Sequence, residues 1–184
     1  MSGANTMYIP RRATARLVDG RSAPLPLSEW RSESAYVLLA DPGAGKTEAF
    51  KTEANETGGL YISARDFVSL RSSAPEAVST LFIDALDEMR AGSSAPSEPL
   101  DAIRRRLDEM GRPLFRIACR EADWISAVDA DAMRAVSPNG ELVELRLEPL
   151  SESEIRTLLR HWRERVPDAD AFWDAAERQH ITAL

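Results

Sequence analysis

The chain has 184 residues, of which 43% are hydrophobic, 23 are Lys or Arg and 30 are Asp or Glu. Its formal charge of −7 disfavours non-specific binding to nucleic acid, and its apolar share is large enough for a buried core, which excludes disorder of the whole chain. The single cysteine allows no internal disulfide, and no apolar run is long enough for a membrane span or a secretion signal. We therefore expect a soluble, cytoplasmic protein without a direct nucleic-acid or membrane partner.

The first 34 residues carry little periodic pattern and predict a partly loose N-terminal segment. Within it, Asp19-Gly20 lies between two short strand-like stretches and predicts a hairpin turn. From residue 35 onward, short apolar runs alternate with helical segments, which is typical of β-α-β units and a mainly parallel sheet. The apolar runs are residues 35–40, 60–62, 81–83, 114–118 and 142–147.

Four segments between and after these runs have helical character. Residues 47–56 are rich in helix formers, and residues 100–110 carry apolar side chains at helical spacing. Residues 151–154 have a capping-box pattern that opens a third helix, which we expect Pro167 to end. A last helical stretch covers about residues 170–180.

The most specific motif is the octapeptide ADPGAGKT, which leads from the first apolar run into a predicted helix, as a phosphate-binding P-loop does. In such a loop, Gly43, Ala44 and Gly45 turn backbone N–H groups inward around the phosphates. Lys46 neutralises the β- and γ-phosphate charge, and the Thr47 hydroxyl ligates Mg²⁺. Only two of the 23 basic residues are lysines, which makes Lys46 informative. The alternative is a glycine-rich turn that caps an ordinary helix.

An acidic motif ends the third apolar run. The sequence LFIDALDE carries Asp84 at the predicted strand tip, where the aspartate of a Walker B motif supports the Mg²⁺ shell. Asp87 and Glu88 follow one turn later and are candidates to orient and deprotonate an attacking water. The alternative is a solvated acidic turn after a strand.

Arg120 ends the predicted strand that begins at residue 114. Because ligand chemistry collects at the carboxyl ends of strands in an open α/β sheet, Arg120 is a candidate sensor of the γ-phosphate. A structural ion pair with a carboxylate is the alternative. We expect Cys119 to pack as a small apolar group rather than to react. The two histidines, His161 and His180, lack the spacing of metal ligands.

These residues together resemble the NACHT branch of the STAND class of signalling P-loop ATPases. The resemblance rests on ADPGAGKT as Walker A, DALDE as Walker B, IACR as the sensor strand and LEPLSESEI as the strand-to-helix passage, and it covers about residues 35–165. It implies a switch in antiviral or stress defence that exchanges ADP for ATP and then self-oligomerises. It also implies effector, winged-helix and sensor domains, so we expect this chain to be the core fragment of a longer protein. We expect Trp162, Phe172 and Trp173 to pack against such a further domain.

The predicted fold is a three-layer α/β/α P-loop NTPase core with a mainly parallel sheet over residues 35–150, after an N-terminal segment over 1–34. The start of a helical lid or arm follows over 151–184. The leading hypothesis is an ATPase that binds Mg²⁺ with ATP or ADP and hydrolyses ATP slowly. ATP is favoured over GTP because the chain lacks an Asn-Lys-x-Asp segment. Two alternatives stay open: a nucleotide-binding scaffold without turnover and a P-loop phosphotransferase.

Overall fold

The structure, a computed structural model, describes residues 8–17, 19–69, 80–93, 95, 97–162, 166 and 168–178. Its strands are β1 (Arg12–Leu17), β2 (Gly20–Arg21), β3 (Leu25–Pro26), β4 (Ala35–Ala40), β5 (Leu60–Ser63), β6 (Thr80–Asp84), β7 (Leu114–Arg120) and β8 (Val143–Leu147). They form one sheet in the order β2-β1-β8-β4-β7-β6-β5, and β3 also pairs with β1. β4 to β8 run parallel to one another, whereas β1 is antiparallel to its neighbours.

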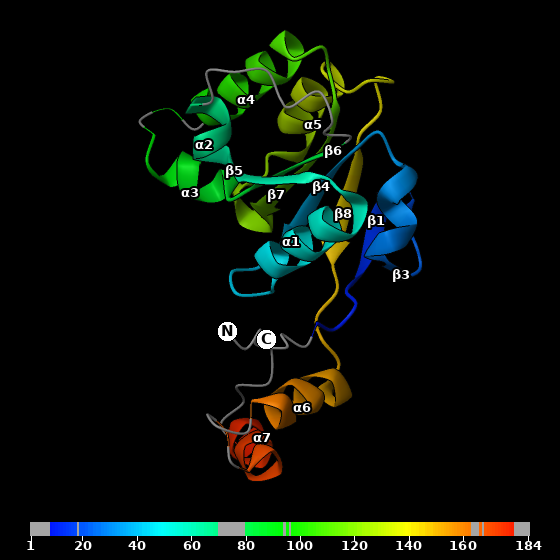
Figure 1. The fold of residues 1–184 in the computed structure, drawn as a ribbon, viewed down its shortest axis with the longest axis vertical. Coiled ribbons are helices and arrows are strands. Elements are labelled where there is room, and N and C mark those ends of the chain that lie inside the picture. Colours follow the sequence, from blue (N-terminus) through cyan, green and yellow to red (C-terminus); the bar gives the residue numbers. More distant parts are fainter. Residues whose placement is uncertain are drawn as a thin grey trace.

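The helices cover both faces of this sheet. They are α1 (Lys46–Thr57), α2 (Ala64–Ser69), α3 (Leu86–Ala91), α4 (Glu98–Glu109), α5 (Ser126–Arg134), α6 (Glu152–His161) and α7 (Ala169–Arg178), with 3₁₀ turns η1 (Leu27–Ser32) and η2 (Glu121–Asp123). On one face, Phe50 of α1 packs edge-on against Tyr36 and Phe82. On the other face, α2 to α5 pack around Val37 and Ile117. Figure 1 shows the strands between α1 and the α4–α5 side of the molecule.

The α/β class with a mostly parallel sheet is the one that the sequence predicts. All five predicted strands are confirmed, and α1, α4, α6 and α7 coincide with predicted helical segments. The pattern does not predict α2, α3 or α5, because helices of six to nine residues hold too few turns to show an apolar period. In the described part of the chain, no helix combines the length and the apolar character that crossing a membrane requires.

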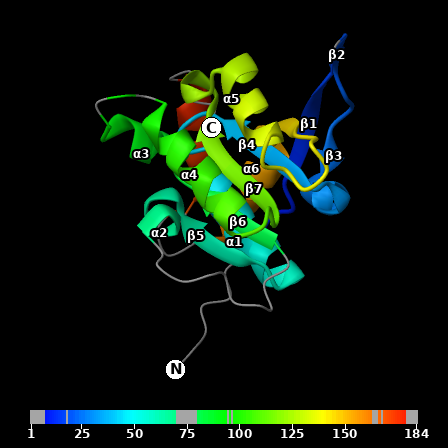
Figure 2. The same ribbon diagram turned by 90° about the horizontal axis from the view of Figure 1, so that it is seen from above.

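The N-terminal segment contributes to the same sheet. β1 and β2 form the antiparallel hairpin that residues 19–20 predict. β1 then pairs with β8, and its Ala13 and Ala15 are buried on the same face as Leu145. This burial stabilises a strand that has no long apolar run. Figure 2 shows the hairpin at the edge of the sheet opposite β5, and residues 1–7 lie outside the described part of the chain.

Beyond β8, α6 and α7 pack against each other, and Figure 1 shows the pair below the sheet. The predicted capping box is confirmed, because Ser151 and Glu154 each accept a hydrogen bond from the backbone N–H of the other. Trp173 is 5% exposed and buried between the two helices, so the prediction that it packs on a further domain is wrong. Trp162 and Phe172 are about half exposed, at 52% and 51%. α6 already ends at residue 161, and Pro167 lies outside the described residues.

Candidate functional site

The predicted site residues gather at one edge of the sheet. β7 lies between β4 and β6, and the three strands are parallel, so their carboxyl ends meet where open α/β sheets bind ligands. A cleft of about 290 Å³, which we name the Lys46 cleft, opens at this edge. It is lined by Pro42, Gly43, Gly45, Lys46, Thr47, Glu48, Asp84, Ala85, Asp87, Glu88 and Arg120. Of the predicted site residues, Ala44 alone is not among these.

The loop between β4 and α1 turns on two glycines. Gly43 has φ +79° and Gly45 has φ +88°, a left-handed backbone that residues with a Cβ rarely adopt. α1 begins directly after Gly45. The first N–H groups of a helix have no partner within it, and they lie at the positive end of the helix dipole. The loop and the start of α1 therefore have the properties of an anion cradle.

Lys46 folds back along this loop. Its Nζ donates hydrogen bonds to the carbonyl oxygens of Ala40 at 2.9 Å and Asp41 at 3.1 Å. Partial removal from water lowers the pKa of Lys46, while the nearby carboxylates of Asp87 and Asp84 raise it. The net effect is a lowered pKa, which means that the protein stabilises the charged ammonium less well than water does. An anion in the cleft would stabilise this charge.

Thr47 and Asp84, which belong to the two predicted motifs, contact each other directly. Thr47 Oγ1 donates to Asp84 Oδ2 at 2.7 Å, and the Tyr61 hydroxyl donates to the same oxygen at 2.8 Å. Asp84 Oδ1 accepts from the backbone N–H of Ala85 at 2.8 Å. Asp84 is only 4% exposed, and these three neutral donors offset the cost of burying its charge.

The oxygen donors at this point suit Mg²⁺. A hydroxyl and a carboxylate are hard ligands, and Mg²⁺ is usually bound by one or two carboxylates together with waters and substrate phosphates. Within the described residues, no group of three or more His, Cys, Asp or Glu side chains is arranged to hold a metal ion. Thr47 and Asp84 therefore fit a cation that phosphate oxygens help to bind, and they do not form a cage of protein ligands alone.

Asp87 and Glu88 are adjacent in sequence but have different surroundings. Asp87 is 8% exposed, and its Oδ2 lies 2.7 Å from Arg120 Nε, which is the ion pair considered as the alternative role of Arg120. Glu88 is exposed and lines the cleft. Ala85, directly before α3, has φ +62°. Such strain in a non-glycine residue persists where the surroundings fix it, and it clusters at functional sites.

A buried ion pair anchors α3, the helix that carries both carboxylates. Arg90 Nη2 donates to Asp129 Oδ2 at 2.8 Å, and the two side chains are 7% and 5% exposed. Arg90 Nη1 also donates to the backbone carbonyl of Asp123. Removing one partner would leave a buried charge uncompensated, so this contact fixes the position of α3 relative to η2 and α5.

Two residues beside the site escape the sequence analysis. Arg11 is 8% exposed and donates hydrogen bonds to the backbone carbonyls of Ala44 and Glu148, each at 2.7 Å. It thus links the glycine-rich loop to the segment that follows β8. It lies in a stretch without periodic pattern, which gives no signal of this contact. Tyr61 is a polar residue inside an apolar strand, and this pattern could have indicated a functional role. Its partner Asp84 is 23 residues away in the sequence, however, and the two side chains meet only because β5 pairs with β6.

The remaining candidates take no part in the cleft. Cys119 is fully buried, and burial raises the pKa of its thiol to about 12, so it packs as an apolar side chain as expected. His161 is exposed at the end of α6. His180 lies outside the described residues.

No protein-family model matches the chain, and no curated protein matches it. The resemblance to NACHT ATPases therefore depends on the residues of this chain alone, and its function has to be argued from the geometry of the Lys46 cleft.

Proposed function

We propose that the Lys46 cleft binds Mg²⁺ with ATP or ADP and hydrolyses ATP slowly, and that the protein is a signalling switch of the STAND/NACHT type in antiviral or stress defence. The main observation in support of a nucleotide site is the 2.7 Å hydrogen bond between Thr47 and Asp84. It joins the glycine-rich loop to an acidic strand end 37 residues further along the chain. Two independent sequence signals thus meet in one cleft, which supports a site for phosphate and Mg²⁺.

The loop and the start of α1 would hold the phosphates. Backbone N–H groups of residues 43–47 would bind them, and Lys46 would exchange its two carbonyl partners for the β- and γ-phosphates. Thr47 and Asp84 would hold Mg²⁺, and Tyr61 would keep the Asp84 carboxylate in place. When bound, Mg²⁺ supplies positive charge at the phosphate oxygens.

Glu88 is the better candidate for the general base. Asp87 already pairs with Arg120, whereas Glu88 is exposed in the cleft and can reach an attacking water. Arg120 faces Asp87 through Nε, so Asp87 would compete with the γ-phosphate for the guanidinium. Because of this competition, we expect turnover to be slow.

The same ion pair supports the second candidate function, a nucleotide-binding scaffold without turnover. Asp87 and Arg120 are held together at 2.7 Å, and they are two of the three groups proposed for hydrolysis. If the pair persists while ATP is bound, the cleft binds nucleotide and does not turn it over. A measurement of phosphate release at saturating ATP separates the two functions.

The test of nucleotide binding is calorimetry with Mg·ADP on Lys46→Ala. We expect affinity to fall about tenfold or more, because charge-assisted hydrogen bonds to the phosphates are lost. Lys51→Ala is the matched control, since Lys51 is the other lysine, lies on the same helix and contacts Glu48 and the Tyr61 ring. Equal affinity of Lys46→Ala and the parent protein would contradict the proposal.

A further inference from the structure

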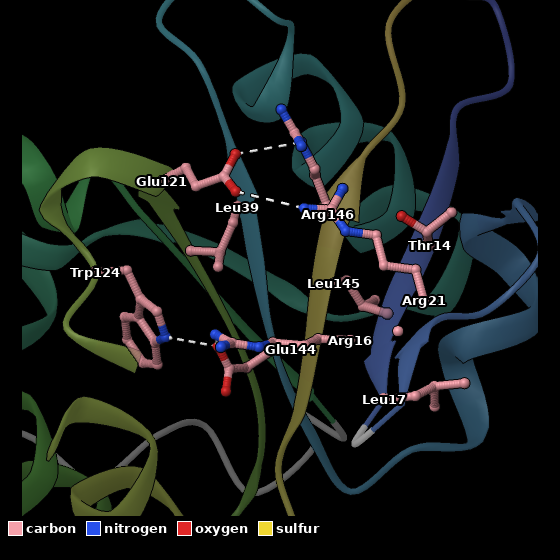
Figure 3. Close-up of a pocket in the computed structure, with 11 residues that line it drawn as sticks. Thr14, Arg16, Leu17, Arg21, Leu39, Glu121, Trp124, Glu144, Leu145 and Arg146 are labelled. Atoms are coloured by element: carbon pink, nitrogen blue, oxygen red, sulfur yellow. Dashed lines mark hydrogen bonds and ion pairs between the residues drawn. The ribbon is translucent and has the colours of Figure 1, made fainter. Parts of the chain in front are cut away.

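A second cleft, of about 450 Å³, lies over β1 and β8 on the same side of the sheet as α5 (Figure 3). On the opposite face, β1 and β8 bury alanine and leucine side chains. On the cleft face the same strands carry polar and charged side chains: Thr14, Arg16, Glu144 and Arg146. Because β1 is antiparallel to both β2 and β8, this edge of the sheet can keep one face polar and open to solvent.

The strand register brings three arginines to this cleft, which we name the arginine cleft. Arg16 and Arg21 are direct partners in the β1–β2 hairpin. Thr14 lies on the same side of β1 as Arg16 and is the direct partner of Arg146 in β8. Directly paired residues share a face, and Figure 3 shows the three arginines around one hollow. Like charges opposite each other destabilise an antiparallel pair, so the stability of the hairpin does not account for Arg16 and Arg21.

Two of the arginines hold one carboxylate between them. Arg21 Nη2 lies 3.7 Å from Glu121 Oε1, and Arg146 Nε lies 3.2 Å from Glu121 Oε2 (Figure 3). Each oxygen of the carboxylate thus faces a different guanidinium. These contacts are two separate ion pairs, so the carboxylate is bound by charge from two sides and not by the two-bond fork of a single arginine.

The other acidic residue of the arginine cleft is fixed more firmly. Glu144 lies 3.5 Å from Arg16, accepts a hydrogen bond from Trp124 Nε1 at 3.1 Å, and its side chain is 11% exposed. The residues that line the arginine cleft include three arginines and two glutamates, and a third glutamate, Glu148, accepts a hydrogen bond from the lining residue Thr14. Displacement of Glu121 would leave Arg21 and Arg146 without this carboxylate partner, which favours another anion in its place.

We propose that the arginine cleft binds a ligand that carries a carboxylate group, and that Arg21 and Arg146 grip this group in the place that Glu121 occupies in the structure. The volume of about 450 Å³ lies in the range of small-molecule sites and also accommodates the side chain of an acidic peptide. The proposal does not depend on nucleotide binding, because Arg21, Glu121 and Arg146 do not line the Lys46 cleft.

Glu121 is easily displaced. The side chains of Arg21, Glu121 and Arg146 are 45%, 39% and 42% exposed, and ion pairs at such exposure contribute little to stability. A released Glu121 regains full hydration, while the two guanidinium groups keep a carboxylate partner. Glu144 stays in place because Trp124 holds it, so it forms a fixed wall of the site.

The experiment measures binding of two carboxylate probes at low salt: succinate by calorimetry, and a fluorescent Glu-Gly repeat peptide by anisotropy with a Gln-Gly peptide as control. We expect the double variant Arg21→Gln, Arg146→Gln to lose about tenfold or more in affinity. The matched control is Arg104→Gln, Arg134→Gln, which removes the same charge from two partly exposed arginines of α4 and α5. Binding of succinate identifies a small-molecule site, and binding of the peptide alone identifies an acidic segment as the ligand.

A second variant changes affinity in the opposite direction. Glu121→Gln removes the internal competitor, so it should tighten probe binding by about two- to fivefold. Asp131→Asn is its control, because it removes the same charge from an exposed ion pair in α5. A purely structural role of the ion pairs would not produce tighter binding.

Two outcomes would overturn the proposal: no salt-sensitive binding of either probe to the parent protein, or equal binding by the Arg21, Arg146 double variant and its control. Circular dichroism verifies that each variant is folded. Lys46→Ala should bind the probes like the parent protein, and the double arginine variant should bind Mg·ADP like the parent protein. These measurements therefore distinguish a lack of carboxylate binding in the arginine cleft from a lack of nucleotide binding in the Lys46 cleft.

Discussion

The Lys46 cleft and the arginine cleft meet at the end of β7 and hold their charges in different ways. Arg120 lines the first, and the next residue, Glu121, lines the second. In the Lys46 cleft, Asp84 and Asp87 are 4% and 8% exposed and have polar partners at 2.7–2.8 Å. In the arginine cleft, the Glu121 side chain is 39% exposed, with arginines at 3.2 and 3.7 Å.

This difference separates a preorganised site from an exchangeable one. A buried carboxylate with short hydrogen bonds loses much when one donor is removed, because its charge stays away from water. An exposed carboxylate regains hydration, so its partners can accept a ligand at low cost. We therefore expect single substitutions in the Lys46 cleft to change nucleotide binding or turnover and to leave probe binding in the arginine cleft unchanged.

Gly45→Ala should have the largest effect. Gly45 has φ +88°, and a Cβ there would lie 2.8 Å from Arg11 Nη1, so either the loop or the Arg11 side chain must move. We expect the free energy of unfolding to fall by about 2 kcal/mol and the affinity for Mg·ADP to fall about 100-fold. Chemical denaturation and calorimetry measure the two quantities.

Gly58→Ala is the control for this prediction. Gly58 has φ +68° at the other end of α1, and a Cβ there meets open space. Its backbone strain should lower the free energy of unfolding by about 1–2 kcal/mol and leave nucleotide affinity unchanged. If both variants bound Mg·ADP equally well, the loop would not be the phosphate site. The Lys46 cleft could then no longer be called a preorganised site in contrast to the arginine cleft.

The location of the Lys46 cleft could be predicted because its signals are local. Eight consecutive residues specify the loop, and five specify the acidic strand end, so each can be recognised without knowing the fold. Parallel strands then bring the two motifs to one edge of the sheet. The residue types and their order in the chain are therefore enough to predict where the Lys46 cleft lies.

The arginine cleft could not be predicted because it depends on register between distant strands. Arg21 and Arg146 share a face only because β1 is inserted antiparallel beside β8 and carries β2 with it. Nothing in the local pattern of either residue indicates this. The same holds for Trp173: Phe172 and Trp173 are neighbours on α7, and only the position of α6 decides which of them is buried.

Glu88→Gln should lower ATP turnover about 10- to 100-fold with little change in nucleotide affinity. A carboxylate that takes a proton from water acts in the transition state rather than in the ground state. Asp87→Asn is the informative companion, because it weakens the pair with Arg120 and so frees the guanidinium for phosphate. Phosphate release and equilibrium binding, measured on both variants, distinguish the roles. Parent-like turnover in both would place the base elsewhere.

Tyr61→Phe should have a smaller effect, confined to Mg²⁺. Burial and the hydrogen bond to Asp84 raise the pKa of Tyr61, so its hydroxyl stays protonated and remains a donor. Without it, Asp84 loses one of three donors, and we expect the Mg²⁺ concentration for half-maximal ATP binding to rise about tenfold. Tyr36→Phe, at a buried tyrosine that does not line the cleft, should leave it unchanged. An unchanged Mg²⁺ requirement in Tyr61→Phe would show that Tyr61 has no positioning role.

Ala85→Gly should have the smallest effect, and it should stabilise the protein. Ala85 has φ +62°, which costs an alanine about 1–2 kcal/mol, whereas glycine adopts this conformation freely but loses about 0.5–1 kcal/mol more entropy on folding. The free energy of unfolding should therefore rise by about 0.5–1 kcal/mol. If the strain serves to aim Asp87 and Glu88, the looser turn should also lower ATP turnover while probe binding in the arginine cleft stays constant. A variant that is more stable and equally active would show that the strained turn contributes nothing to the Lys46 cleft, and denaturation together with phosphate release decides between the two results.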